Sequence, residues 1–444
     1  MRSDLHDCPS SDNDPTAYYA AYAVAKQKHL AGLLARINVQ ALEEAASRVR
    51  DGVACRIPLL AATNLDSRSR ADRVSRQCGG QNCHLDVEFA DGVTWVARIR
   101  LDDPLLPPPA VQAHIFLSEV ATLKFLENTA VPAPRMYAYE AADSPGNAVG
   151  MSYVLMEKLP GKPLDWGRAT TEGRVRVLEQ LADLYLELEK HPIPLTGSLT
   201  PTSTSMWGGF AQMPCFEAPD RTLGPFGTLD EAYSAIINQQ QKVLTNHEVS
   251  SLQVDNYLAF LWRLEALPEL VANSLSRAGP FYLKHYDDKG DHLLVDEEYN
   301  ITGVIDWEFA SAEAKELAFN SPCMTWPVGD FYDGNNALAD DEEKFAAIFE
   351  RRGRADMAAI VRGGRRWQRY LFFLGGGIPR DVAEFEPLFQ GLQKSFSGEG
   401  SQKVISSYKE WKQGALTEFS KGDLELQALL RNEWAKNRKA SGGV

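Results

Sequence analysis

The 444-residue chain is acidic, with 46 Lys and Arg against 60 Asp and Glu and a net charge of -14. This balance argues against a nucleic-acid or anionic-membrane partner, since both require concentrated Lys and Arg for phosphate contact. A hydrophobic fraction of 44% indicates a globular protein, and no apolar run approaches the roughly twenty residues of a membrane span. The polar, acidic N-terminus lacks a secretory pattern, and six cysteines make no disulfide framework, so we expect a cytoplasmic protein.

The N-terminal part of the chain predicts a polar tail over 1–15 and two helices, over 16–37 and 42–49. A pair of glycines, Gly79 and Gly80, precedes the next apolar segment. Adjacent glycines permit close approach of the backbone to a phosphate, but they equally permit any tight turn.

The segment 85–100, LDVEFADGVTWVARIR, predicts a β-hairpin. Apolar residues alternate with polar ones on both sides of Asp91-Gly92, which is a strong two-residue turn signal. Arg98 therefore lies inside the second strand, where it could also be an ordinary solvated side chain.

A helix follows over 118–126, with Glu119 in its first turn, where an acidic side chain can complement the helix dipole. The apolar segment 151–161 predicts a strand that breaks at a Pro-Gly pair. The section 191–227 is rich in Pro, Ser, Thr and Gly and predicts a long irregular insertion, of the kind that often forms a lid or binds substrate.

The segment 281–309 carries the strongest chemical signal. A tight hairpin near its end would bring a polar loop that holds Asp287 close to the strand end that presents Asp306. One carboxylate could deprotonate a substrate hydroxyl while the other holds a divalent ion against nucleotide phosphates. Three short strands are predicted here, over 281–283, 293–295 and 301–305.

The C-terminal third predicts helices over 340–362 and 364–374, and a charged helix pair after residue 398. Glu308, two positions beyond Asp306, could bind a cationic substrate, or it could anchor this part of the fold through a salt bridge.

The 281–309 segment resembles the aminoglycoside phosphotransferase family, the small-molecule relatives of the protein kinases. His285, Asp287 and position 292 fall on the family's H-x-D-x-x-x-x-N loop, and Ile305-Asp306-Trp307 fall on its I-D-W/F segment. The resemblance implies that Asp287 is the catalytic base and Asp306 a magnesium ligand.

The second metal position departs from the family, because His292 stands where the family has Asn. Magnesium prefers oxygen ligands in near-octahedral geometry. Either Asp291 substitutes for the Asn or catalysis is impaired. A further departure is Tyr286, where the family usually has Gly.

The resemblance extends upstream through the order of the elements. It implies that Arg98 replaces a Lys that contacts the nucleotide phosphates, although a planar guanidinium and an ammonium reach phosphate differently. Glu119 would then be the partner of Arg98. The remaining residues implied in nucleotide binding are Glu157 and Leu159, through hinge backbone groups that meet adenine, and Gly79 and Gly80, as a weak glycine-rich loop.

The implied fold is α+β and bilobal, like that of the protein kinases, with a small β-rich N-lobe, a larger mainly helical C-lobe and extra helices at both ends. The expected divisions are an N-terminal tail and helical extension (1–50), an N-lobe (51–157), a C-lobe (158–397, with the insertion at 191–227) and a C-terminal helical extension (398–444).

The implied function is an ATP-dependent phosphotransferase that acts on a small-molecule hydroxyl or amine with Mg²⁺, or with Mn²⁺. The acidic composition would favour a cationic substrate, although acidity often serves only solubility. The alternative is a catalytically impaired, kinase-like protein that binds nucleotide or regulates a partner. It is motivated by His292 and by the lack of a G-x-G-x-x-G motif.

Overall fold

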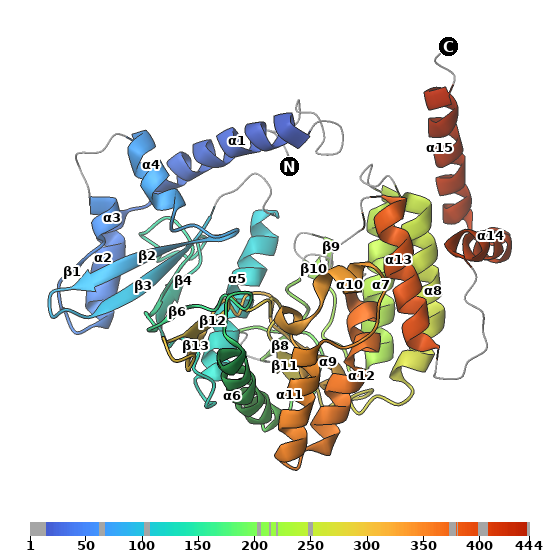
Figure 1. Cartoon of the computed structure of the whole chain (residues 1–444). Helices are drawn as coiled ribbons and strands as arrows, with labels where there is room; N and C mark the ends of the chain where they lie inside the picture. Colours follow the sequence, from blue (N-terminus) through green and yellow to red (C-terminus); the bar gives the residue numbers. More distant parts are fainter. Residues whose placement is uncertain are drawn as a thin grey trace.

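The protein folds into two lobes, a smaller one built on a β-sheet and a larger one that is mainly helical (Figure 1). This confirms the predicted α+β, bilobal, kinase-like fold with extra helices at both ends. No helix of the described part of the chain is long and apolar enough to cross a bilayer. The structure is a computed structural model that describes residues 15–61, 67–101, 107–201, 206–212, 215–218, 221–246, 252–372, 379, 381–397 and 407–441. The predicted tail, apart from Pro15, lies outside these residues.

The N-lobe is centred on an antiparallel five-stranded sheet in the order β1-β2-β3-β5-β4. The predicted hairpin is confirmed, since β2 and β3 pair along their whole length on either side of the Asp91-Gly92 turn. The strands are β1 (Cys55–Arg56), β2 (Asn82–Phe89), β3 (Thr94–Arg100), β4 (Met136–Glu140) and β5 (Tyr153–Glu157).

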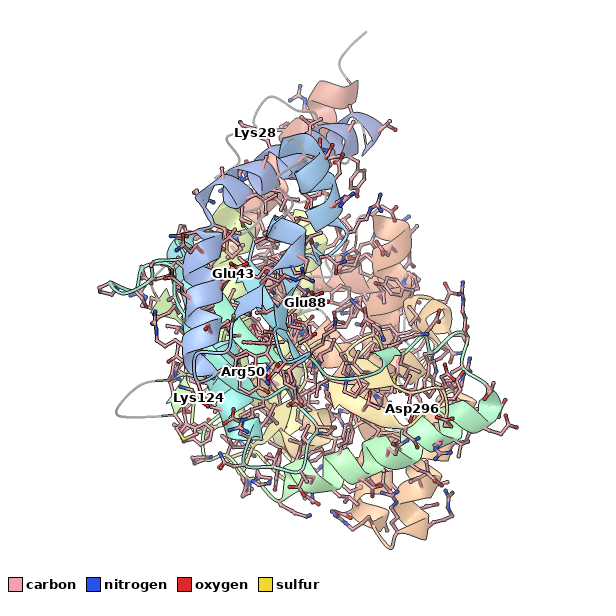
Figure 2. All side chains as sticks on the ribbon, turned by 90° about the vertical axis from the view of Figure 1, so that its left-hand side faces the viewer. Lys28, Glu43, Arg50, Glu88, Lys124 and Asp296 are labelled. Atoms are coloured by element: carbon pink, nitrogen blue, oxygen red, sulfur yellow. The ribbon has the colours of Figure 1, made fainter. Side chains whose placement is uncertain are left out.

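Four helices of the described chain lie before β2: α1 (Pro15–Arg36), α2 (Val39–Val49), α3 (Pro58–Ala61) and α4 (Ser67–Ser75). Both predicted N-terminal helices are confirmed. Helix α2 is fixed to the sheet by Glu43, which accepts the Ile57 N–H at 2.9 Å, and by Arg50 just beyond its end (Figure 2). The Arg50 guanidinium pairs with Asp91 at 2.6 Å and lies 4.6 Å from the centre of the Phe89 ring.

Helix α5 (Pro109–Leu126) begins at Pro109, nine residues before the predicted start. Proline is favoured at the first helical position, where its missing N–H is not needed. The expectation that Glu119 lies in the first turn is therefore wrong, because Glu119 lies in the middle of the helix and is buried. Its carboxylate does not complement the helix dipole and needs another partner.

The connection between the lobes starts at the end of β5. β5 is an inner strand, because it lies between β3 and β4. The chain then enters β6 (Lys162–Pro163), which pairs with a strand of the C-lobe. Gly161 allows this crossing: its φ is +102°, and a Cβ there would lie 2.4 Å from the Thr302 Oγ1.

The C-lobe holds two small antiparallel sheets that carry the segment 281–309. β12 (Leu293–Val295) lies between β6 and β13 (Ile301–Val304), and β11 (Tyr282–Lys284) pairs with β14 (Ser311–Glu313). The three predicted strands are thus present, within one residue of their expected bounds. The insertion contains the short strands β7 (Ser198–Leu199), β8 (Trp207–Gly208), β9 (Phe216–Ala218) and β10 (Arg221–Thr222).

The helices of the C-lobe surround these strands (Figure 1). The break in the region 340–374 lies around Gly353, which has a φ of +73°, and not at residue 363 as predicted. The longer helices are α6 (Thr171–Glu189), α7 (Leu229–Asn246), α8 (Gln253–Val271), α11 (Asp340–Arg351), α12 (Ala355–Phe372), α13 (Val382–Phe396), α14 (Tyr408–Phe419) and α15 (Leu424–Ser441). The short ones are α9 (Lys315–Ala318) and α10 (Val328–Tyr332).

Candidate active site

The polar loop after β11 is closed against the end of β13. The ring of His285 makes a 2.9 Å hydrogen bond to the Ile305 carbonyl, and the Ile305 N–H donates to the His292 carbonyl at 2.9 Å. These two bonds hold the loop that contains Asp287 against the segment that continues into Asp306. Asp306 has a left-handed φ of +64°, an uncommon backbone state for a residue other than glycine.

Lys289 shows how close the loop carboxylates lie to Asp306. Its ammonium contacts Asp287 at 2.7 Å and Asp291 at 3.8 Å. The hydrogen bond that Lys289 donates to Asp287 raises the pKa of Lys289, and Asp291 and Asp306 add to the rise. The side chains of Asp287 and Asp306 are 49% and 55% exposed, so both remain accessible to a ligand.

Arg98 connects the two lobes. From the middle of β3 its guanidinium contacts Glu119 on α5, Asp306 at 2.7 Å and Glu308 at 2.9 Å. Burial alone would lower the pKa of Arg98, but the three carboxylates raise it above its ordinary value. The solvated side chain considered for Arg98 is therefore wrong, because its side chain is 6% exposed.

Sequence reasoning missed Arg100 and Asn82. The Arg100 guanidinium pairs with Glu308, and the Asn82 amide donates to the same carboxylate at 2.7 Å. Arg100 lies two positions from Arg98 on one strand and so faces the same side of the sheet, a signal that the sequence contained. Glu308 anchors the lobes by salt bridges, which confirms the second of its two expected roles.

The network of Arg98 and its partners has an excess of negative charge. Two guanidiniums, of Arg98 and Arg100, face three carboxylates, of Glu119, Asp306 and Glu308. Burial raises the pKa of Glu119; Arg98 opposes the rise, and Glu308 and Asp306 add to it. Nearby His84 adds no charge, because burial and then Arg98 lower its pKa to about 4. An additional cation would relieve the excess.

His292 is turned into the C-lobe. Its side chain is buried, its ring lies 4.4 Å from that of His285, and its Nδ1 accepts the Gly290 N–H at 3.3 Å. Burial, together with His285, lowers the pKa of His292 to about 3. Asp291, the neighbour of His292 in the same loop, has an exposed carboxylate.

Glu157 lies at the end of β5, and the glycine pair lies just before β2. The Glu157 N–H donates to the Arg135 carbonyl at 2.8 Å, which ties the end of β5 to the entry of β4. Gly79 and Gly80 form the tip of a tight turn that leads into β2, closed by a 2.8 Å bond from the Gly79 N–H to the Asn82 carbonyl. A Cβ at Gly80 would meet open space.

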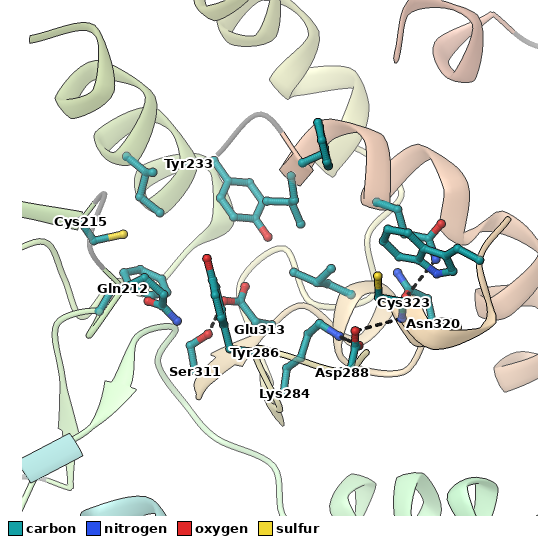
Figure 3. A pocket seen from close by; sticks show the side chains of 17 residues that line it. Gln212, Cys215, Tyr233, Lys284, Tyr286, Asp288, Ser311, Glu313, Asn320 and Cys323 are labelled. Carbon is teal, nitrogen blue, oxygen red and sulfur yellow. Dashed lines mark hydrogen bonds and ion pairs between the residues drawn. The ribbon is translucent and has the colours of Figure 1, made fainter. Parts of the chain in front are cut away.

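A cavity of about 340 Å³ lies in the C-lobe beside the loop 285–292 (Figure 3). We call it the Glu313 pocket. Lys284 and Asp288 form a 2.9 Å ion pair in its wall, and Tyr286, the neighbour of Asp287, also lines it. Its apolar lining consists of Phe210, Ile236, Leu317, Trp326, Leu371 and Phe372.

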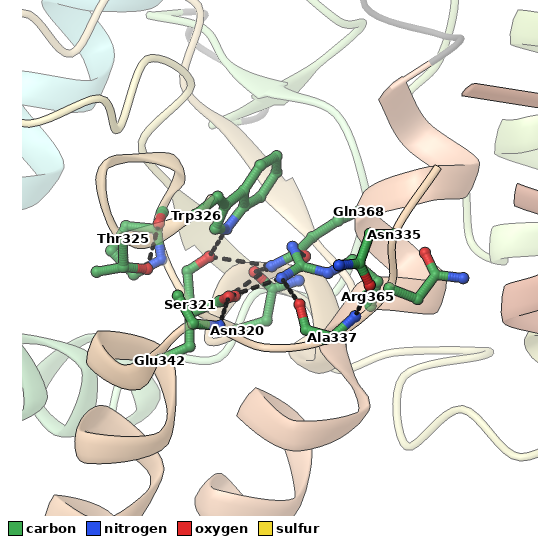
Figure 4. Close-up of polar contacts among 12 residues, drawn as sticks. Asn320, Ser321, Thr325, Trp326, Asn335, Ala337, Glu342, Arg365 and Gln368 are labelled. Carbon is green, nitrogen blue, oxygen red and sulfur yellow. Dashed lines mark hydrogen bonds and ion pairs between the residues drawn. The ribbon is translucent and has the colours of Figure 1, made fainter. Parts of the chain in front are cut away.

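A buried polar network supports one side of this pocket (Figure 4). Arg365 pairs with Glu342 at 2.6 Å, and both side chains are almost fully buried. Gln368 donates to the Ser321 hydroxyl at 2.9 Å, and the Trp326 indole donates to the Ser321 carbonyl at 3.0 Å. The network fixes Trp326 and Gln368, which both line the pocket.

A basic strand residue braced by a helix carboxylate, a hinge and a loop aspartate beside a second aspartate define the class of kinase-like phosphotransferase folds. The family model described as the phosphotransferase enzyme family, APH, matches residues 85–313, about half of the chain. The chain belongs to this family.

Two curated fungal proteins are similar to parts of the chain. A subtelomeric hrmA-associated cluster protein of Aspergillus fumigatus is 33% identical over 151 residues, which are 33% of this chain and 27% of that protein. The clavilactone A biosynthesis cluster protein Y of Ampulloclitocybe clavipes is 28% identical over 262 residues, 54% of this chain and 61% of that protein. The chain therefore spans less than two thirds of the length of both relatives.

Solved structures of phosphotransferases are also similar. A thermostable mutant of aminoglycoside phosphotransferase APH(4)-Ia with ADP and hygromycin B is 15% identical, with a TM-score of 0.41 over 72% of this chain and 92% of that one. Macrolide 2'-phosphotransferase MphH from Brachybacterium faecium is 16% identical, with a TM-score of 0.35 over 79% of this chain and 97% of that one.

Proposed function

We propose that the protein transfers the terminal phosphoryl group of ATP to a hydroxyl or amine of a small molecule. The observation that carries this proposal is the contact of Arg98 with both Glu119 and Asp306, beside the loop that holds Asp287. Phosphoryl transfer needs positioned phosphates, a held metal ion and an oriented nucleophile, and these residues are of the types that supply them.

Each residue then has one task. Asp287 accepts the proton of the acceptor hydroxyl as its oxygen attacks the terminal phosphorus, the bond to the bridging oxygen breaks, and ADP leaves. Arg98 contacts the phosphates and Glu119 braces it. The backbone of Glu157 and Leu159 meets the adenine. The turn at Gly79 and Gly80 covers the phosphates.

Asp306 would hold the metal ion. No group of three or more His, Cys, Asp and Glu among the described residues is placed to hold an ion alone. Magnesium does not need a site formed by protein ligands alone, since one or two carboxylates together with the substrate phosphates are sufficient. The charge excess around Arg98 and the exposed Asp306 fit this mode, and Asp291 suits a second position better than the inward His292. When bound, the ion would neutralise charge on the phosphates.

The test uses the purified full chain with Mg-ATP or Mn-ATP and a panel of small alcohols and amines, with ADP release as the readout. We expect acceptor-dependent turnover that Asp287→Asn lowers about 100- to 10,000-fold. The matched control is Asp143→Asn, which removes an exposed carboxylate of an N-lobe loop and should change nothing. Absence of nucleotide binding at every divalent ion concentration would refute the proposal.

The second function is nucleotide binding without transfer. It is favoured by the existing ion pair between Arg98 and Asp306, which occupies the carboxylate that the metal would need. ATP binding that persists in calorimetry, with no ADP release for any acceptor, would support this function over the first.

A further inference from the structure

The Glu313 pocket contains several polar atoms that lack partners within the described part of the chain. The Tyr233 hydroxyl, the Gln212 Oε1 and the Asn320 Nδ2 are all buried without a hydrogen bond. Buried polar groups are nearly always paired, and each unpaired one costs roughly 1–3 kcal/mol. Three of them on residues that line one cavity indicate that the cavity receives a polar ligand.

The carboxylate of Glu313 is the uncompensated charge of this pocket. It accepts a 2.6 Å hydrogen bond from the Ser311 hydroxyl, and the Tyr233 hydroxyl points toward it closely enough to oppose the rise of its pKa, although its geometry falls short of a full hydrogen bond (Figure 3). The nearest cation, Lys284, is paired with Asp288. The three ionisable groups therefore sum to one negative charge. Burial raises the pKa of Glu313 to about 7, as expected for a carboxylate without a cationic partner.

The remaining walls limit the size and character of the ligand. Most of the lining is apolar, with the rings of Phe210, Trp326 and Phe372 among it. A volume of about 340 Å³ is near the lower end of the roughly 300–1,000 Å³ typical of ligand sites. Both features suit a compact, largely apolar molecule better than a chain of amino sugars.

Tyr286 joins the pocket to the catalytic loop. It follows His285, precedes Asp287, and its ring lies 5.8 Å from that of Phe309, three residues after Asp306. Its pKa is raised first by burial and then by Cys215, Asp287 and Glu313, so Tyr286 lies within electrostatic range of both carboxylates. A ligand in the pocket would therefore contact the residue that precedes Asp287 in the chain.

We propose that the Glu313 pocket binds the acceptor as a compact, mainly apolar amino alcohol, with one protonated amine on Glu313 and its hydroxyl toward Asp287. This rests on the proposed function only in calling the ligand the acceptor. The Tyr233 hydroxyl donates to the ligand, and the aromatic walls cover its apolar part.

Binding is measured by calorimetry on the full chain without nucleotide, at pH 8. The probes are 2-amino-1-phenylethanol, the neutral 1-phenylethane-1,2-diol and the polycationic amino sugar kanamycin. We expect the amine to bind at least tenfold more tightly than either comparison probe. Glu313→Gln should weaken amine binding about 10- to 100-fold and leave diol binding within twofold, since it removes only a charge-assisted bond.

Tyr233→Phe is the second variant and should weaken amine binding about threefold to tenfold. Circular dichroism and melting temperature establish that both variants fold. Equal affinity for amine and diol, preference for the amino sugar, or an unchanged preference in Glu313→Gln would each overturn the pocket assignment. Transfer from Mg-ATP is assayed separately. Amine binding without transfer would refute the proposed function alone, whereas transfer to acceptors independent of Glu313 would refute the pocket assignment alone.

Discussion

The Arg98 network and the Glu313 pocket use buried charge in opposite ways. Around Arg98, each of the three carboxylates contacts a guanidinium of the protein, although the group as a whole keeps one excess negative charge. In the pocket, a single carboxylate is left without a cation of its own, among apolar walls. The difference indicates that the first site is assembled for stability before any ligand arrives, whereas the second awaits a charged partner. Substitutions that remove charge should therefore have opposite effects on stability at the two sites.

The largest change in stability is expected for Arg98→Ala. Removing one partner of a buried ion pair costs about 3–5 kcal/mol, because the carboxylate of Glu119 is left buried and unpaired, while Glu308 loses one of its two guanidinium partners and retains Arg100 and Asn82. The matched control is Arg362→Ala, which breaks exposed ion pairs with Glu343 and Glu350 and should cost under about 1 kcal/mol. Urea unfolding measures both, and equal losses would contradict the comparison.

Glu313→Gln should stabilise the protein at pH 8 by on the order of 2–3 kcal/mol. The pKa of Glu313 rises from an ordinary 4.5 to about 7 on folding, so the folded state holds the proton more tightly. Wild-type stability is therefore lost as the pH rises from about 4.5 through 7, and the variant escapes this loss. At pH 4 the two proteins should unfold alike, as followed by melting temperature from pH 4 to 8.

The other titratable side chains beside Glu313 do not complicate the interpretation of stability between pH 4 and 8. The titratable side chains beside it are Lys284, Tyr233, Tyr286 and Cys215. Burial raises the pKa of each of the last three above ordinary values that already lie at 9 or 10. A variant that gains nothing at pH 8 would mean that Glu313 already has a cationic partner in the free protein.

Gly161→Ala tests the connection between the two lobes. The new Cβ would lie 2.4 Å from the Thr302 Oγ1 and 2.8 Å from the Val295 carbonyl, at a φ of +102°. We expect a loss of about 1–3 kcal/mol and weaker ATP binding. Gly80→Ala is the control for stability, since its Cβ meets open space, and it should stay within about 0.5 kcal/mol of wild type.

The smallest expected effect is on metal binding, and it distinguishes the roles of two neighbouring residues of the loop 285–292. Asp291→Asn should raise the Mg²⁺ concentration needed for half-maximal turnover about tenfold, or about 1.4 kcal/mol, if its carboxylate helps to hold the metal. His292→Asn should change that concentration less than twofold, because the ring faces the interior. A gain of turnover in His292→Asn would instead indicate a metal site weakened by the histidine.

The fold was predictable because its signals are local. Alternating residues around Asp91-Gly92 predicted β2 and β3, and the hairpin before Asp306 was predicted in the same way. Helix α5 was predicted too short because its buried residues are concentrated in its second half, the part that the apolar spacing marked, whereas its first half shows no clear apolar and polar faces. The break at Gly353 was missed because Gly363 and Gly364, which read as a stronger break, are accommodated within α12.

The two sites also differed in how far the sequence predicted them. The residues around Arg98 come from segments with recognisable patterns, and only their partners Arg100 and Asn82 were missed. The Glu313 pocket has no linear pattern, because its walls come from the insertion, α7, β11, β14 and α12, which meet only in the folded chain. Glu313 lies in a three-residue strand of small and acidic residues that gave no indication of a cavity.

The choice of arginine at position 98 has a mechanical consequence. A lysine ammonium on β3 could pair with the carboxylate on α5 without contacting the larger lobe. The Arg98 guanidinium has several N–H donors and contacts carboxylates of both lobes at the same time. Separating the lobes must then break contacts to Asp306 and Glu308 before the hinge can turn. Separation of the lobes and release of Asp306 are therefore the same event. A nucleotide that binds with its ion would then meet an Asp306 carboxylate that has just lost its contact with Arg98.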